Sequence, residues 1–349
     1  MKTEILKIDD STQSLEEALF PAAEIIRGGG TVVFPTETVY GLGGDATNPA
    51  SAEKIYAAKG RPADNPLIIH LAEPIEAEKY AVTCELYYRL AERFMPGPLT
   101  VILPAKQTIP ERTRAGLSTV AVRIPKSPIA RTLIRLSGVP IAAPSANLSG
   151  SPSPTTAQHV TDDMLGRVDM IIDGPDAEFG LESTIVKIED SSALTLLRPG
   201  AVTVDDLLNV TKNVNIASAV TEKLGEGERP LSPGMKYRHY APRASVVLLD
   251  GDASGAAQYI KSQAKKNIAI IAYDEDVSAY RREFFGAVIY SFGAKCDTLT
   301  QANRLFYILR EADKQNFDEI YAPLPEKEGI GLALYNRMIR AAAYKTVKV

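Results

Sequence analysis

Residues 59–70 read KGRPADNPLIIH, and the interpretation of the whole chain starts from this stretch. Two cations, Lys59 and Arg61, flank a glycine, and a proline-punctuated turn leads into an apolar run that ends at His70. A short apolar run bounded by Gly and Pro is typical of a buried strand. The stretch therefore predicts a strand that follows two cations and ends at a histidine.

The composition is that of a globular protein with more than one core. The chain has 349 residues, is 45% hydrophobic and 23% charged, and carries a formal net charge of -4. This length predicts two domains. No apolar run reaches the length of a membrane span, and the first residues lack a signal-peptide core. Two cysteines cannot form a disulfide framework, so we expect a cytoplasmic protein with no membrane partner.

Residues 1–207 combine many short apolar runs with few helical patterns. TVVFPT, PLIIHL, LTVIL, VAVRIP and STIVKIE are strand-like, and LEEALFPAAEIIR before GGG at 28–30 is an amphipathic helix. Such a mixture predicts an α+β sheet that is partly antiparallel, rather than regular βαβ winding. We expect these residues to form the first of two domains.

The pattern changes after this domain. Residues 208–243 are polar and punctuated by Gly and Pro, which predicts an interdomain linker. Residues 244–349 alternate strands and helices as βαβαβαβα, the pattern of a small doubly wound parallel sheet. No GxGxxG follows the first strand, SVVLLD, so the pattern does not favour dinucleotide binding there.

Several common catalytic constellations are missing from the sequence. It has no P-loop and no GxSxG motif. Its three histidines, His70, His159 and His239, lie far apart with no cysteine nearby, so we predict no metal site made by protein side chains. A pI of about 5.6 argues against a protein that coats nucleic acid through bulk charge.

Cations and small polar residues recur where strands of the first domain end in turns. The segments are PTETVYGLG (35–43), KGRPADNP (59–66), GLSTVAVRIP (116–125), APSANLSGSPSP (143–154), LESTIV (181–186) and LLRPG (196–200). They supply Lys59, Arg61, Arg123 and Arg198, and Arg238 follows later in the chain. Each cation alone is more simply a solvated residue, and each loop alone is more simply a turn. Together they predict an anion site, with a nucleotide as the favoured ligand.

In this order, the segments resemble the YrdC-type threonylcarbamoyl-AMP synthase family, with K-x-R at 59–61 and S-x-N at 145–147. The extension and SPGMKYRHYAP at 232–242 resemble its long two-domain form, so the likeness covers nearly the whole chain. The fold it implies is α/β: a twisted N-terminal α+β sheet with a positive cavity, followed by a small Rossmann-like domain with a parallel sheet.

The resemblance implies a nucleotidyltransferase that condenses L-threonine, bicarbonate or CO2, and ATP into threonylcarbamoyl-AMP and pyrophosphate. The product serves the threonylcarbamoyl modification of the adenosine next to the tRNA anticodon, through a downstream transferase. Mg²⁺ is expected to enter with ATP, held mainly by phosphates and water. Direct tRNA binding is not required.

The resemblance also assigns roles to residues of this chain. Arg123 would hold the threonine carboxylate as a bidentate pair. The other residues expected to bind threonine are Thr38, His70, the backbone at Ala143, and Ser183. Lys59 and Arg61 are the expected catalytic cations. The residues expected to contact ATP are Lys59, Arg61, Asn65, Thr119, Ser145, Asn147, Ser153, Arg198, His239 and Tyr240.

Segment 232–242 admits two interpretations of equal weight. It could be a rigid strap between domains, or a lid that folds over the cavity and shields a labile anhydride from water.

Two other functions of the protein also remain open. A positive concave sheet could bind double-stranded RNA by shape. A carbamoyl-transferring maturation factor with the same core would need cysteine-rich zinc fingers, which two cysteines cannot supply.

Overall fold

The structure is a computed structural model that describes residues 1–9, 11–223, 240–265 and 267–349. The chain divides into two compact units, Met1–Ser149 with Ser153–Lys236, and Gly150–Pro152 with Tyr237–Val349. Among the helices in the described ranges, none is both long enough and apolar enough to cross a membrane.

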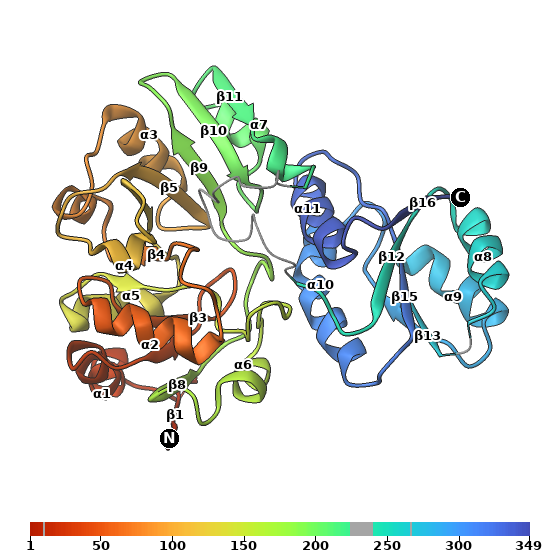
Figure 1. The fold of residues 1–349 in the computed structure, drawn as a ribbon, viewed down its shortest axis with the longest axis horizontal. Coiled ribbons are helices and arrows are strands. Elements are labelled where there is room, and N and C mark those ends of the chain that lie inside the picture. The colour runs from red at the N-terminus through yellow and green to blue at the C-terminus, as the bar shows by residue number, and fades with distance from the viewer. Residues whose placement is uncertain (10, 224–239, 266) are drawn as a thin grey trace. The chain divides into compact units, whose positions relative to one another are not determined.

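The first unit is built on an 11-stranded mixed sheet (Figure 1). In order across the sheet, its strands are β1 (Glu4–Lys7), β8 (Met170–Asp173), β2 (Val32–Phe34), β3 (Gly41–Asp45), β7 (Ile141–Ala142), β4 (Ile68–His70), β6 (Thr119–Arg123), β5 (Leu99–Pro104), β9 (Thr184–Ile188), β10 (Ala193–Arg198) and β11 (Asn213–Ile216). Parallel pairs such as β4–β6 adjoin antiparallel pairs such as β5–β6. The prediction of a partly antiparallel α+β sheet is confirmed.

Helices pack against this sheet. They are α1 (Leu15–Arg27), α2 (Pro49–Lys59), η1 (Pro74–Lys79), α3 (Glu85–Phe94), α4 (Glu111–Arg114), α5 (Pro128–Ser137), α6 (Ala157–Met164), α7 (Val204–Leu208) and η2 (Ser218–Val220). Leu19 of α1, Leu133 of α5 and Phe34 of β2 share one buried cluster, so the apolar stripe read from the sequence of α1 faces the core.

Helix α2 delivers the first cation of the opening stretch. Asn48 caps its N-terminus by accepting from the Ala50 amide at 3.0 Å, and Pro49 follows at the first helical position. Gly60 ends the helix with φ 61°, a left-handed conformation that glycine adopts without strain. Lys59 is therefore fixed as the last helical residue, directly before the turn that leads to β4.

The prediction of a linker over residues 208–243 is wrong for its first part. Strand β11 pairs in parallel with β10, and η2 follows it. β11 is exposed at three of its four positions, so it has no alternation of buried and exposed residues for a sequence pattern to show. Backbone pairing to β10 places it in the sheet. Residues 224–239, which hold most of the rest of this interval, lie outside the described residues.

The second unit is a five-stranded parallel sheet between two layers of helices. Its strand order is β14 (Val288–Ser291), β13 (Ile268–Ala272), β15 (Glu319–Pro323), β12 (Ser245–Asp250) and β16 (Thr346–Lys348). Its helices are α8 (Ala253–Ser262), α9 (Asp274–Glu283), α10 (Thr298–Asp313) and α11 (Gly331–Ala341).

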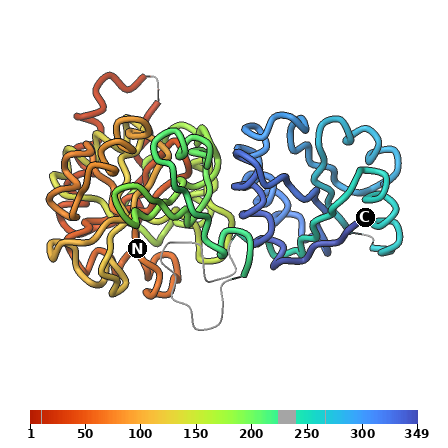
Figure 2. Tube along the Cα trace, turned by 90° about the horizontal axis from the view of Figure 1, so that it is seen from above, coloured from red at the N-terminus to blue at the C-terminus, as the bar shows by residue number. Residues whose placement is uncertain are grey.

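Helices α8 and α9 cover one face of this sheet, and α10 and α11 the other (Figure 1). The predicted alternation of strands and helices is confirmed. The structure adds β16, a short exposed strand that pairs with β12. The last residue, Val349, at the end marked C in Figure 2, donates its amide to Asp250 O at 2.9 Å.

Candidate functional site

Five residues on adjacent strands form one row across the first unit, called the central row below. His70 on β4 pairs with Arg123 on β6, Arg123 with Thr100 on β5, Thr100 with Ile185 on β9, and Ile185 with Arg198 on β10. Residues paired across strands project from the same face of a sheet. At about 4.8 Å per strand, the Arg123 and Arg198 backbones lie about 14 Å apart. Two of the predicted cations therefore share one face of the sheet.

Arg123 is held by a buried ion pair. Its Nη2 donates to Glu37 Oε1 at 2.8 Å and to Thr38 Oγ1 at 2.8 Å. The Arg123 and Glu37 side chains are only 5% and 3% exposed, so this pair is shielded from water. Glu37 also accepts from the Lys126 amide through Oε2 at 3.0 Å, which fixes the carboxylate on both oxygens. Thr38 therefore lies beside Arg123, and the predicted contact of both residues with threonine stays a prediction.

The bonds of Arg123 limit how it could hold a carboxylate. Nη2 has two hydrogens, and Glu37 and Thr38 accept both. Its Nε is buried with no hydrogen-bond partner among the described residues. A bidentate pair with a ligand therefore requires Thr38 to give up its bond or to rotate. The predicted bidentate contact stays a prediction, and it now carries this condition.

Ser183 and Arg198, predicted to bind different substrates, contact each other directly. Arg198 donates from Nε to Ser183 O at 3.0 Å and from Nη2 to Ser183 Oγ at 3.1 Å. Ser183 Oγ also lies 2.7 Å from Thr100 Oγ1, next to Arg123 in the central row. All three side chains are buried, and a chain of hydrogen bonds runs from Arg198 through Ser183 to Thr100, the residue that pairs with Arg123 across the strands.

Lys59 of the K-x-R segment bonds the S-x-N segment at 145–147, which begins 86 residues later in the chain. Its ammonium donates to Ser145 O at 2.5 Å, to Asn147 O at 2.6 Å and to Asn147 Oδ1 at 3.2 Å. Ser145 Oγ donates to the same Asn147 Oδ1 at 2.6 Å. Lys59 is 3% exposed. It therefore shapes the S-x-N loop, and in this arrangement it would act on a phosphate chiefly as a nearby buried charge.

Asn65 carries polar atoms without partners. Its side chain is buried, and neither Oδ1 nor Nδ2 has a hydrogen bond among the described residues. Arg61, partly buried, donates from Nη2 to Asn65 O and Pro66 O at 3.3 Å each. A buried polar atom without a partner costs about 1–3 kcal/mol, so such atoms in a native structure call for an explanation. A bound ligand supplies one for Asn65.

We expect Asn65→Leu to stabilise the protein by about 1–3 kcal/mol in urea unfolding, because it removes two unsatisfied buried groups. The same change should reduce ATP-dependent activity at least about tenfold if the amide contacts the nucleotide. Asn147→Leu is the matched control, because the Asn147 side chain bonds Lys59 and Ser145 and its loss should destabilise. A less stable Asn65→Leu protein would contradict this interpretation of Asn65.

Ser153 and Thr119 extend the set of predicted nucleotide residues. Ser153 Oγ donates to Glu182 Oε1 at 2.5 Å, and both residues are buried, with Glu182 next to Ser183 in the chain. Thr119 lies four residues before Arg123 on β6 and so faces the same side, about 13 Å away. The predicted contacts thus spread over a face long enough for an extended ligand.

His70 and Ala143 lie together at the end of β4. The Ala143 amide donates to Ile68 O at 2.9 Å, which leaves the Ala143 carbonyl as the backbone group that a ligand could use. His70 Nδ1 also lies 3.1 Å from Ile68 O. Because a carbonyl oxygen only accepts, Nδ1 carries the proton in the neutral ring. Burial, and then the charge of Arg123, lower the pKa of His70 to about 3. At neutral pH it is an uncharged ring, and the Ile141 backbone also bonds it.

The lowered pKa of His70 predicts an acid-dependent loss of stability. The folded-state pKa of about 3 lies below the ordinary value near 6.5, so the stabilisation is complete above pH 6.5 and declines as pH falls toward 3. Between pH 7 and pH 5 the loss should be about 2 kcal/mol. We expect urea unfolding of His70→Asn, whose amide replaces Nδ1, to lack this component. Equal pH dependence in both proteins would contradict a buried neutral His70.

Gly200 of the LLRPG segment leaves room for the start of β9. A Cβ at this position would lie 2.6 Å from the Thr184 amide nitrogen and 2.8 Å from Glu182 O, both in the backbone. We expect Gly200→Ala to cost about 1–3 kcal/mol of stability and to displace Ser183. Gly28→Ala, at φ -74°, is the control and should cost about 1 kcal/mol at most. Equal unfolding midpoints for the two variants would refute this.

The structure describes only some of the residues of the predicted lid. Arg238 and His239 lie outside the described residues. Tyr240 is buried in the second unit, where its ring stacks on Phe306 at 5.1 Å and the Arg337 guanidinium lies 5.6 Å from its centre. The contact of Tyr240 with a nucleotide, like the lid itself, stays a prediction.

Protein ligands for a metal do not gather in the described ranges. Residues 1–9, 11–223, 240–265 and 267–349 contain no group of three or more His, Cys, Asp or Glu side chains that could hold an ion.

Three polar residues of the site were not predicted: Glu37, Glu182 and Thr100. Glu37 and Glu182 stand inside segments that the sequence analysis singled out, PTETVYGLG and LESTIV. A search for anion-binding residues does not select carboxylates. These two bind the cation and the hydroxyl next to them, and do not bind an anionic ligand. Thr100 looks like an ordinary strand residue, and only the β5–β6 register reveals its place beside Arg123.

Comparisons with known proteins cover both units. The family profile Sua5_yciO_yrdC, described as "Telomere recombination", matches residues 24–200. A second profile, Sua5_C, described as "Threonylcarbamoyl-AMP synthase, C-terminal domain", matches residues 202–343. The threonylcarbamoyl-AMP synthase of Bacillus subtilis (strain 168) is 39% identical over 354 residues, with 100% of both chains covered.

Relatives from archaea are equally similar. The threonylcarbamoyl-AMP synthase of Pyrococcus abyssi is 41% identical over 339 residues, which cover 94% of this chain and 95% of that one. The crystal structure of P. abyssi Sua5 complexed with L-threonine matches with a TM-score of 0.89 and 38% identity, over 99% of this chain and 100% of that chain. The chain therefore belongs to the Sua5/YciO/YrdC family, in the long form that carries the Sua5 C-terminal domain.

Proposed function

We propose that this protein is a threonylcarbamoyl-AMP synthase: it condenses L-threonine, bicarbonate or CO2, and ATP into threonylcarbamoyl-AMP and pyrophosphate. Full-length relatives that carry this name support the activity, and one related structure contains L-threonine. As a nucleotidyltransferase, the enzyme would supply the threonylcarbamoyl group for tRNA modification in the cytoplasm. The next step belongs to a separate transferase, and direct tRNA contact is not required.

The single observation that carries the proposal is the central row. Arg123 and Arg198 stand on one face of the sheet and are both buried; Arg198 bonds Ser183, Ser183 bonds Thr100, and Thr100 pairs with Arg123 in the strand register. A guanidinium group matches a carboxylate or a phosphate. Within the part of the chain that the structure describes, the buried Nε of Arg123 and the buried side-chain amide of Asn65 have no hydrogen-bond partner. This arrangement suits an amino acid at the Arg123 end and an anionic nucleotide beside it.

The chemistry requires positioning rather than a covalent nucleophile. The neutral threonine amine adds to CO2 and loses a proton to give a carbamate. A carbamate oxygen then attacks the α-phosphorus in line, and the bond to pyrophosphate breaks. Binding both reactants next to each other and stabilising charge that develops on the phosphate are the main means of acceleration.

The residues of the site divide these tasks. Arg123, with Thr38 and His70, would hold threonine, and the uncharged His70 would accept a hydrogen bond from its hydroxyl or amine. Lys59 and Arg61 would provide positive charge near the phosphates. Asn65, Ser145, Asn147, Ser153, Thr119 and Arg198 would contact the nucleotide. Mg²⁺ would enter as part of the MgATP substrate, held mainly by phosphate oxygens and water.

Pyrophosphate release tests the proposal. The purified full-length chain is incubated with MgATP, threonine and bicarbonate in the absence of RNA. We expect pyrophosphate only when all three substrates are present, and none when serine replaces threonine at low concentration. No pyrophosphate, together with salt-dependent binding of tRNA, would instead support a nucleic-acid-binding module.

A further inference from the structure

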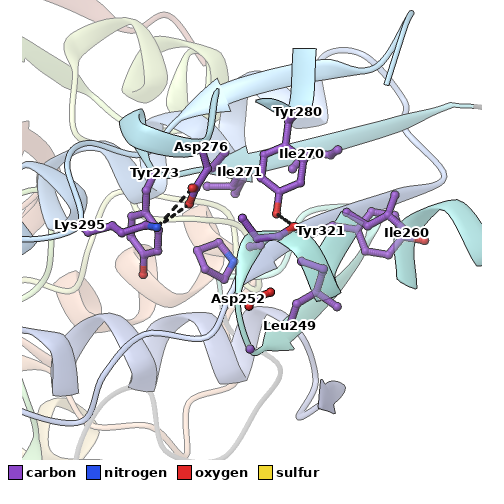
Figure 3. A pocket seen from close by; sticks show the side chains of 16 residues that line it. Leu249, Asp252, Ile260, Ile270, Ile271, Tyr273, Asp276, Tyr280, Lys295 and Tyr321 are labelled. Carbon is purple, nitrogen blue, oxygen red and sulfur yellow. Dashed lines mark hydrogen bonds and ion pairs between the residues drawn. The ribbon is translucent and has the colours of Figure 1, made fainter. Parts of the chain in front are cut away.

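A cavity of about 70 Å³ opens in the second unit, at the carboxyl ends of three parallel strands (Figure 3). Leu249 at the end of β12, Tyr273 just after β13 and Pro323 at the end of β15 line it. All the described lining residues belong to the second unit, so the cavity shares none of them with the residues of the first unit discussed above.

The topology of the sheet explains why a cavity lies here. β15 lies between β12 and β13 in the sheet. After β12 and β13 the chain enters α8 and α9 on one face, whereas after β15 it enters α11 on the other. The loops of adjacent strands therefore leave in opposite directions and open a crevice. In doubly wound folds, ligands bind in this crevice, at the topological switch point.

The charged side chains around the cavity are mostly acidic. Asp252 and Asp276 line it, and the one lining cation, Lys295, already pairs with Asp276 at 3.0 Å. The Lys295 amide is also bound by the Glu275 carboxylate, at 3.1 Å and 3.2 Å. Asp252 uses Oδ1 to cap α8 through the Gly255 amide at 2.8 Å and is exposed to solvent at the mouth. One carboxylate of the lining is thus not matched by a lining cation.

This charge distribution disfavours an anionic ligand. In nucleotide-binding folds of this type, a phosphate occupies the helix N-terminus after the first strand. Here the carboxylate of Asp252 holds that position, and the first turn of α9 carries Asp274, Glu275 and Asp276. A phosphate would face like charge from both helices. The absence of GxGxxG after β12 agrees with this conclusion.

Aromatic rings complete the surroundings. The ammonium of Lys295 lies 5.9 Å from the centre of the Tyr273 ring, between that ring and Asp276 (Figure 3). Burial raises the pKa of Tyr280 to about 12, with the charges of Asp276, Glu283 and Asp252 adding to the effect. Burial and nearby carboxylates also raise the pKa of Tyr273. The cavity therefore combines aromatic faces with one carboxylate, Asp252, that no cation among the described lining residues pairs, and both features favour organic cations.

We propose that this cavity binds a small alkyl amine, with its ammonium group against Asp252, the lining carboxylate that Lys295 does not neutralise, and its hydrocarbon part on the apolar floor. Ala256, Ile260 and Ile270 form that floor, and all three are buried. The size of the cavity limits the buried part of the ligand to a few non-hydrogen atoms. The Lys295–Asp276–Tyr273 contact is an intramolecular example of the same recognition.

Three probes of similar size and different charge test the proposal: n-butylamine, butan-1-ol and butyrate. Each is added to the full-length protein at low ionic strength, and binding is followed by saturation-transfer NMR and by titration. We expect binding of n-butylamine alone, with a dissociation constant roughly in the millimolar range for so small a ligand. Salt should weaken it. Binding of butyrate or butan-1-ol at equal strength, or no binding of the amine, would overturn the proposal.

Variants locate the amine. Asp252→Asn removes the charge but keeps the helix cap, since asparagine caps as well as aspartate. Asp276→Asn removes the second carboxylate and leaves Lys295 unpaired. Each should weaken amine binding at least about fivefold. Asp250→Asn is the matched control, because Asp250 is exposed and does not line the cavity. Equal affinity in all three variants would place the amine elsewhere and refute the assignment. These readouts do not depend on the activity of the first unit.

Discussion

Glu37→Gln is expected to destabilise the folded protein by about 3–5 kcal/mol, because it leaves the Arg123 charge buried without a counterion. Glutamine retains an acceptor for Arg123, so the effect isolates charge rather than hydrogen bonding. The free energy of unfolding in urea at pH 7 measures it.

The chain offers a matched control in the same region. Glu178 pairs with Lys126 at 3.0 Å, but the two side chains are 52% and 57% exposed. Exposed ion pairs contribute little, so Glu178→Gln should change stability by about 0.5 kcal/mol or less. If both variants lost the same free energy, the Arg123–Glu37 pair would not have the buried character that we assign to it.

Arg123→Met is expected to raise the KM for threonine on the order of 10- to 100-fold, with a much smaller effect on the KM for ATP. The loss of one charge-assisted contact to a carboxylate, about 1.5–3 kcal/mol, sets this range. Pyrophosphate release at varied threonine and varied ATP separates the two constants. An unchanged KM for threonine would show that Arg123 does not hold the amino acid.

A double variant separates binding from folding. Arg123→Met alone leaves the Glu37 carboxylate buried and unpaired, so part of its effect would reflect instability. Combining it with Glu37→Gln removes both charges and should return stability to within about 1 kcal/mol of the parent. The KM for threonine should stay high. Recovery of that KM in the double variant would mean that Arg123 acts through the fold and not through contact with threonine.

The sequence predicts the fold well where burial follows a pattern. The 3.6-residue spacing of Leu19, Ala22 and Ile26 matches the buried face of α1, and the apolar runs at 245–250 and 268–272 are buried parallel strands. It fails where backbone pairing decides the structure. β11 and β16 are short and largely exposed, so no apolar alternation distinguishes them from loop.

The same division applies to the site. Motif segments predict that Lys59, Arg61, Arg123 and Arg198 belong to one site, because their types suit an anion. What each cation does depends on pairing that no sequence pattern shows. Lys59 donates to the 145–147 loop, and Nη2 of Arg123 is occupied by Glu37 and Thr38. The cations themselves could be predicted from the sequence, but the residues that bond them could be identified only from the structure.

The most direct test of the central claim, that one face of this sheet joins threonine to the nucleotide through a carbamate, is the identity of the product. The full-length protein is incubated with MgATP, ¹⁵N-threonine and ¹³C-bicarbonate, and the adenylate formed is analysed by mass spectrometry. We predict a single adenylate that carries both labels. An adenylate with the ¹⁵N label alone would mean direct activation of the threonine carboxylate, and would contradict the account.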